Sequence, residues 1–135
     1  MVYVTRKSEF SAAHRLFNPK FTPEQNEAVF DKCNNPSGHG HNYAVEVTVA
    51  GEPNDGSGYV IDLKKLNRLI DEEIIEKVDH KHLNYDVDFL KGIIPTAENL
   101  AISFWKILCP KINEGRLYSI RVYESDKNYV EYRGE

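Results

Sequence analysis

The chain has 135 residues, a length that suits one domain with a hydrophobic core of its own. Its 17 basic and 21 acidic residues give a net charge of −4 and form no basic cluster, which argues against a nucleic-acid-binding protein. No segment approaches the roughly 20 apolar residues of a membrane span, and the first residues lack the apolar core of a signal peptide. We therefore predict one cytoplasmic domain, residues 1–135, with Cys33 and Cys109 as free thiols.

The first part of the chain combines two strand patterns with a long loop. β-Branched and aromatic residues up to about Phe10 predict a first strand. Residues 18–38 include three prolines and are expected to form an irregular segment, which at this length is usually functional or mobile. Residues 44–49 alternate apolar and polar side chains and predict a half-buried second strand.

Two amphipathic patterns predict helices. Asp62 suits the N-cap of a helix that extends to Val78, because apolar side chains recur between them at helical spacing. A second helix is expected to begin at Thr96, directly after Pro95, and to end at Pro110.

The C-terminal residues predict a β-hairpin, with strands at 117–123 and 129–132 and a turn at 125–128. The resulting order of elements is ββααββ. This order predicts an α+β domain in which an antiparallel sheet carries two helices on one face. The outer strands of such a sheet expose unpaired backbone groups, and closing several sheets into a barrel across subunits is one way of covering them.

Three histidines in the first third of the chain suggest a metal site. His39 and His41 are separated by one glycine, and in a strand such residues point to the same face about 6.5–7 Å apart. His14, from a paired strand, would complete a set of three. Three neutral nitrogen ligands leave Zn²⁺ one position for water or substrate, which is the arrangement of a catalytic metal.

Cys33 leaves a second interpretation of these histidines open. It lies six residues before His39 in a polar turn, where a thiol is accessible. As a fourth ligand it would close the site, and a closed site contributes folding energy and no chemistry. The protein would then be a zinc-stabilised binding module without catalytic activity, and spacing alone does not separate the two hypotheses.

Further candidate residues lie in the second half of the chain. Asp79 precedes His80, and an aspartate that orients an imidazole makes a proton-transfer device. Adjacent residues rarely bond to each other directly, so a polar helix end is the simpler interpretation of this pair. Glu98 is also explained as a favourable acid at a helix N-terminus, and Glu124 as an exposed carboxylate at a strand end.

Several segments taken together resemble the 6-pyruvoyltetrahydropterin synthase family. The similarity runs in chain order over nearly the whole sequence and includes the histidine motifs, the cysteine turn, the start of the second helix and the C-terminus. The matching segments are residues 10–16, 33–43, 79–83, 96–99, 122–124 and 132–135.

The resemblance implies a tunnelling fold, in which ββααββ subunits join their sheets into a trimeric barrel. Two trimers would stack into a homohexamer with active sites shared between subunits. It also implies a lyase that uses Zn²⁺ and no external redox cofactor. The expected substrate is 7,8-dihydroneopterin triphosphate, and the expected product is 6-pyruvoyltetrahydropterin, with elimination of triphosphate, for tetrahydrobiopterin synthesis.

The resemblance also implies a role for particular residues. Zinc is expected to be held by His14, His39 and His41. Proton transfer is expected from Cys33, Asp79 and His80. The pterin ring is expected to be bound by Glu124, with Thr96 and Glu98 nearby.

The related 6-carboxytetrahydropterin synthases of the queuosine pathway are the alternative within the same resemblance. They act on the same substrate and release acetaldehyde. Their cysteine typically lies nearer to the first histidine of the pair than the six residues that separate Cys33 from His39. The spacing therefore favours the pyruvoyl synthases.

Overall fold

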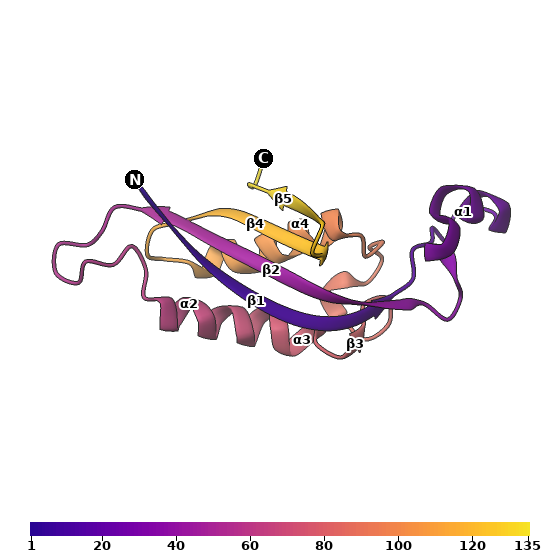
Figure 1. Ribbon diagram of the computed structural model, residues 1–135, viewed down its shortest axis with the longest axis horizontal. Helices are drawn as coiled ribbons and strands as arrows, with labels where there is room; N and C mark the ends of the chain where they lie inside the picture. The colour runs from indigo at the N-terminus through magenta and orange to yellow at the C-terminus, as the bar shows by residue number, and fades with distance from the viewer.

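A five-stranded sheet in the order β3-β1-β2-β4-β5 forms one layer of the molecule. The computed structural model describes residues 1–135. In it, β1 (Val2–His14) and β2 (His39–Gly51) pair antiparallel over their full length and form a long curved ribbon (Figure 1). β4 (Arg116–Ser125) pairs with the other side of β2, and β5 (Asn128–Tyr132) pairs with β4. β3 (Lys81–His82) is short and runs parallel to β1.

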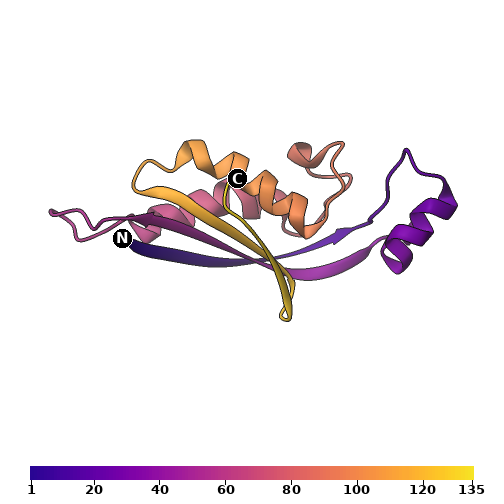
Figure 2. The ribbon, with the colours of Figure 1, turned by 90° about the horizontal axis from the view of Figure 1, so that it is seen from above.

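The main helices lie together on one face of this sheet (Figure 2). α2 (Leu63–Ile70), a π-helical turn (Asp71–Ile75) and α3 (Glu76–Val78) follow one another without a break, and α4 (Ala97–Leu108) is the second long helix. The side chain of Asp62 accepts a hydrogen bond from the backbone N–H of Lys64 at 2.8 Å and so caps α2 as predicted. No helix is both long and apolar enough to cross a bilayer.

The core forms between the helices and the side chains that alternate inward along the strands. Val45 and Val47 of β2 are fully buried and belong to the same cluster as Ile70 and Phe104 of the helices. Burying a side chain of this size contributes about 1.5–3 kcal/mol. The predicted arrangement, a sheet with two long helices on one face, is therefore confirmed.

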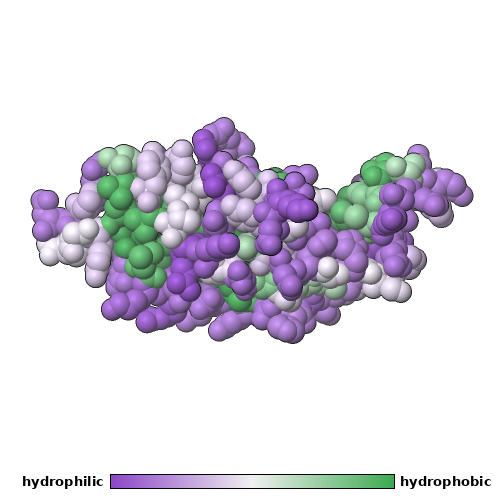
Figure 3. All heavy atoms as spheres, viewed as in Figure 1, coloured by the Kyte–Doolittle hydropathy of each residue, from purple (hydrophilic) through white to green (hydrophobic).

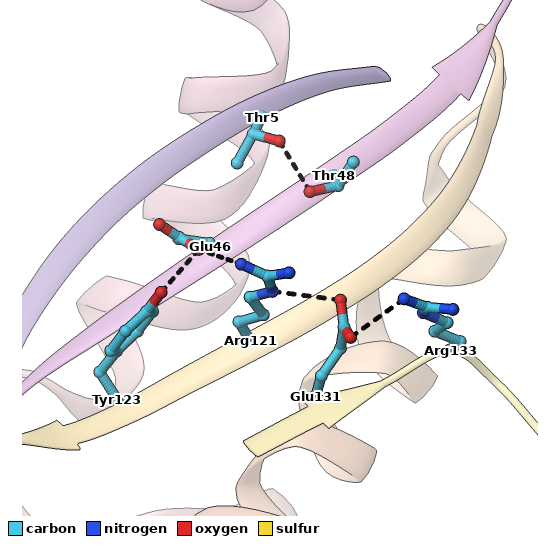
Figure 4. Close-up of polar contacts among 7 residues, drawn as sticks. All are labelled: Thr5, Glu46, Thr48, Arg121, Tyr123, Glu131 and Arg133. Carbon is cyan, nitrogen blue, oxygen red and sulfur yellow. Dashed lines mark hydrogen bonds and ion pairs between the residues drawn. The ribbon is translucent and has the colours of Figure 1, made fainter. Parts of the chain in front are cut away.

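The helix-free face of the sheet is largely hydrophilic over its middle (Figure 3). Five of its side chains form what we call the Arg–Glu network, which crosses three strands (Figure 4). Arg121 Nε donates to Glu131 Oε1 at 3.1 Å, and Arg133 Nη2 donates to Glu131 Oε2 at 3.2 Å. The Tyr123 hydroxyl donates to Glu46 Oε1 at 3.2 Å. These five polar side chains therefore pair with one another.

The expectation of an irregular segment over residues 18–38 was wrong for its middle part. α1 (Pro23–Phe30) is a helix, followed by a 3-10 turn (Asp31–Asn34), and it stands at the far end of the β1–β2 ribbon (Figure 1). Thr22 and Gln25 form a capping box, and Pro23 occupies the first helical turn. These are ordinary helix-start signals. They were overlooked because the three prolines of the segment suggested an irregular loop.

The expectation of a purely antiparallel sheet was also incomplete. β3 adds a parallel strand at the end of β1, where Ala12 pairs with Lys81 and Ala13 with His82. β1 and β2 are also longer than their apolar patterns predicted, because both continue through the histidines. This extension brings the histidines into the sheet and sets their positions.

Candidate metal centre and active site

Three histidines meet where β1 ends and β2 begins, and we call His14, His39 and His41 the histidine cluster. In the sheet register His14 lies directly opposite His39, and His41 follows on the same face of β2. The ring centroids are 4.6, 5.0 and 4.8 Å apart, and one nitrogen from each ring lies within 4.8 Å of the others. The predicted convergence of these three side chains is confirmed, and the cluster could hold a metal ion.

His14 is the fully buried member of the cluster. Its Nδ1 donates to the carbonyl oxygen of Pro95 at 2.8 Å, which leaves Nε2 directed toward Nε2 of His39 at 3.0 Å. Burial lowers the pKa of His14 from 6.5 to about 4, and the neighbouring histidines act in the same direction. The ring is therefore neutral near pH 7, and a neutral imidazole nitrogen is the form that binds a metal.

The cluster contains buried nitrogens without a hydrogen-bond partner, namely Nδ1 of His39 and Nε2 of His41. Nε2 of His41 lies 3.1 Å from Oε1 of Glu124, but not in a direction that makes a hydrogen bond. Burial lowers the pKa of His41 although the Glu124 carboxylate acts in the opposite direction. Buried polar groups are nearly always paired, and an ion shared by the three rings would give His41 its missing partner. The donor set therefore fits a divalent transition-metal ion.

Cys33 does not belong to this cluster. Both cysteines are free, as predicted, and Cys33 is half-buried in the 3-10 turn Asp31–Asn34. Its carbonyl oxygen accepts a hydrogen bond from the N–H of Leu16 at 2.8 Å, which ties this turn to the chain that leaves β1. The only metal-ligand cluster consists of three histidines, so the structure does not support a closed site with a sulfur ligand.

Asp79 and His80 do contact each other, contrary to the expectation for adjacent residues. His80 Nδ1 lies 3.0 Å from Asp79 Oδ1, and the same oxygen accepts a hydrogen bond from the N–H of Ser11 at 2.9 Å. His80 has a φ of 60°, in the left-handed region that few non-glycine residues adopt. The Ser11 hydrogen bond is the main reason that the pKa of Asp79 is lowered.

Two cavities open beside the histidine cluster, and His41 lines both. One, of about 490 Å³, also contains His80, whose side chain is 82% exposed. The other, of about 230 Å³, contains Glu98 from the first turn of α4 and Glu124 from the end of β4. The structure thus brings His80, Glu98 and Glu124, which are far apart in sequence, close to a single candidate metal ligand.

Thr96 begins α4, as predicted. Its hydroxyl caps α4 by accepting a hydrogen bond from the N–H of Asn99 at 3.2 Å. Two groups around His14 were not found from the sequence. Tyr43, whose hydroxyl lies 3.2 Å from His14 Nδ1, follows His41 at a spacing of two and could have been found from that pattern. The Pro95 carbonyl carries no signal in the sequence.

The fold and the site together define a small α+β domain with a three-histidine cluster at one end of its sheet that could hold a metal ion. The sequence model of one family, described as 6-pyruvoyl tetrahydropterin synthase, matches residues 3–135. The chain therefore belongs to the 6-pyruvoyl tetrahydropterin synthase family, and it is an enzyme of that family.

Individual relatives agree with this assignment. The 6-pyruvoyl tetrahydrobiopterin synthase of Poecilia reticulata is 45% identical over 133 residues, which cover 98% of this chain and 90% of the relative. The solved structure of Caenorhabditis elegans 6-pyruvoyl tetrahydropterin synthase matches with a TM-score of 0.94 at 40% identity and covers 99% of this chain and 96% of that one.

A relative from the alternative group is more distant. The 6-carboxy-5,6,7,8-tetrahydropterin synthase of Rickettsia bellii is 29% identical over 150 residues, which cover 97% of this chain and 99% of the relative. The sequence is thus more similar to the pyruvoyl enzymes, as the spacing between Cys33 and His39 predicted.

Proposed function

We propose that this chain is a zinc-dependent lyase that converts 7,8-dihydroneopterin triphosphate into 6-pyruvoyltetrahydropterin and triphosphate. The observation that carries the proposal is the convergence of His14, His39 and His41 next to the carboxylate of Glu124, in a chain that belongs to this family. Bound by the three histidines, zinc would supply a Lewis acid for the side-chain oxygens of the substrate.

Glu124 is the proposed anchor of the pterin ring. Its carboxylate can accept two hydrogen bonds, one from the ring amino group and one from the neighbouring ring N–H, and such charge-assisted pairs fix geometry as well as add energy. Glu98 lines the same cavity and offers a second carboxylate. Because His41 is 3.1 Å from Glu124, a ring held there places its side chain at the histidine cluster. Thr96 supports this site by capping the helix that carries Glu98.

His80 is the proposed proton donor and acceptor in the other cavity that His41 lines. The contact with Asp79 orients the imidazole, and the Ser11 N–H in turn fixes the Asp79 carboxylate. The exposed ring opens into the cavity of about 490 Å³ that also contains His41. General acid–base catalysis of this kind contributes typically 10²–10⁴-fold in rate.

Cys33 is the proposed base for a carbon-bound proton, since a thiolate is a suitable nucleophile and base for that task. It lies outside the histidine cluster of its own chain, which is consistent with an active site completed between subunits. Both cysteines are free, and thiols stay reduced in the cytoplasm, so we place the enzyme there.

The assembly is proposed to be a homohexamer built from two trimeric barrels. β1 pairs with β3 only at Ala12 and Ala13, so most of its outer edge has no partner strand, and β5 forms the opposite edge of the sheet. Such edges are usually covered in native proteins, and pairing them between copies closes the sheets into a barrel.

One substrate tests the proposal against both alternatives. The zinc-loaded full-length protein is incubated with 7,8-dihydroneopterin triphosphate, and the products are separated and identified. We expect triphosphate and 6-pyruvoyltetrahydropterin. Release of acetaldehyde would identify a 6-carboxytetrahydropterin synthase, and no turnover by a protein that binds zinc would identify a binding module.

A further inference from the structure

The surroundings of His14 decide which of its ring nitrogens can bind a metal. Nδ1 lies 2.8 Å from the carbonyl oxygen of Pro95 and 3.2 Å from the hydroxyl oxygen of Tyr43. A carbonyl oxygen can only accept a hydrogen bond, so Nδ1 carries the ring proton and Nε2 keeps its lone pair. Nε2 is the nitrogen that lies 3.0 Å from the ring of His39.

The Pro95 carbonyl is held in place by the turn that begins α4. The N–H of Thr96 donates to the carbonyl oxygen of Ile94 at 2.8 Å, which closes a three-residue turn around Pro95. Asn99 Nδ2 donates to the same Ile94 oxygen at 2.9 Å. Because two donors fix the Ile94 carbonyl, the neighbouring Pro95 carbonyl keeps the orientation in which it meets His14.

Tyr43 places the second oxygen beside His14. Its side chain is buried and stacks on Phe10, with ring centroids 4.8 Å apart and planes inclined by 10°. The hydroxyl group of this rigid ring has one hydrogen-bond neighbour, Nδ1 of His14. If the imidazole ring flipped about its Cβ–Cγ bond, a carbon would take the place of Nδ1 beside the two oxygens. The hydrogen-bonding contacts would then be lost, so both oxygens favour the observed orientation of the ring.

We propose that Tyr43 and Asn99 are positioning residues of the metal centre. Tyr43 acts directly and Asn99 acts through the Pro95 carbonyl, and together they set the tautomer and the orientation of His14. This role rests on the metal site of the proposed lyase but not on its substrate. Groups that bond to the outer nitrogen of a ligand histidine typically change metal affinity by about 10–100-fold.

Zinc affinity of the full-length protein tests the proposal, measured by competition with a chromophoric chelator. Tyr43→Phe removes the hydroxyl, and Asn99→Asp removes the donor to Ile94. We expect each variant to bind zinc about tenfold to a hundredfold more weakly than the wild type. An unchanged affinity in both variants would overturn the proposal, and an unchanged affinity in one removes that residue from the role.

Two matched controls separate positioning from a general loss of stability. Tyr123→Phe removes a hydroxyl that bonds to Glu46 on the other face of the sheet. Asn26→Asp removes an amide donor to the carbonyl of Asn18, a bond that holds another turn in the same manner. Both controls should bind zinc like the wild type, and a loss equal to that of the test variants would overturn the proposal.

A measurement on the metal-free wild-type protein needs no variant to fold. Nitrogen-15 NMR of the histidine rings should show His14 protonated at Nδ1, and protonation at Nε2 would contradict the proposal. A protein that meets these expectations but does not turn over dihydroneopterin triphosphate would refute the proposed function and leave the positioning role intact.

Discussion

Two polar clusters lie on opposite faces of the same sheet and differ in how they use their hydrogen-bonding groups. The Arg–Glu network lies on the helix-free face, where Glu131 accepts hydrogen bonds from both Arg121 and Arg133 (Figure 4). The histidine cluster lies on the side of the helices, and it contains buried nitrogens without partners, on His39 and His41. The side chains of the first cluster pair with one another, whereas the second cluster has nitrogens that a bound ion could satisfy.

This difference indicates which cluster has a function beyond folding. Exposed ion pairs contribute about 0–1 kcal/mol each, so the Arg–Glu network is a solvated surface with modest stabilising value. A buried donor or acceptor without a partner costs about 1–3 kcal/mol. The unpaired nitrogens beside the neutral His14 therefore mark the histidine cluster as a candidate metal site.

The largest effect is expected from removing a member of the histidine cluster. His41→Ala removes one of the three proposed metal ligands, and this side chain also lines both cavities. The variant should therefore retain no stoichiometric zinc and no measurable turnover. Elemental analysis of the purified protein and product analysis measure this. Arg121→Ala, on the other face, should keep its zinc, and if it too loses the metal the contrast between the clusters is wrong.

Cys33→Ala should lower turnover without affecting the metal. The thiol lies outside the ligand cluster, so zinc content and oligomeric state should be those of the wild type, while the rate falls by about 10²–10⁴-fold as a general base is lost. Single-turnover kinetics and elemental analysis measure the two quantities. If the variant lost zinc together with the thiol, Cys33 would be a zinc ligand. The closed structural site would then be the correct interpretation.

Glu124→Gln should weaken substrate binding and leave the metal in place. Replacing the carboxylate removes charge-assisted hydrogen bonds worth about 1.5–3 kcal/mol, so pterin affinity should fall by roughly ten- to a hundredfold. Equilibrium binding of a pterin ligand to the zinc-loaded protein measures it, with zinc content as the control. Wild-type affinity in this variant would remove Glu124 from its role as anchor.

The smallest effect is expected in the Arg–Glu network. Burial raises the pKa of Glu131, but the hydrogen bond and charge of Arg121 outweigh it and hold that pKa below 4.5. A lowered pKa in the folded state stabilises the protein above the unfolded value, and the gain is lost as the pH falls through the folded value. Glu131→Gln should therefore lower the free energy of unfolding by at most about 1 kcal/mol near pH 7. Urea unfolding of the wild type and the variant should show that their difference in free energy of unfolding becomes smaller below about pH 4.5. A difference that stays constant down to pH 3 would contradict this assignment.

Much of the site could be predicted because its signals are local. The His39–His41 spacing places two imidazoles on one face of a strand, whatever the rest of the fold does. Asp62 and Thr96 were expected at the two helix starts, and both cap helices in the structure. The contact between Asp79 and His80 was not expected, and neither was the positive φ of His80, which only the surrounding structure can impose.

The sequence by itself determined the two helices that cover the sheet, the face on which His39 and His41 lie, and the family to which the chain belongs. Periodicity and spacing are enough for these, since side-chain direction follows directly from residue number within a strand or helix. Only the tertiary structure decided that His14 lies opposite His39 and that the Pro95 carbonyl, 81 residues along the chain, sets its tautomer. Strand register depends on long-range packing, and a backbone carbonyl is the same chemical group in every residue, so neither can be identified from sequence alone.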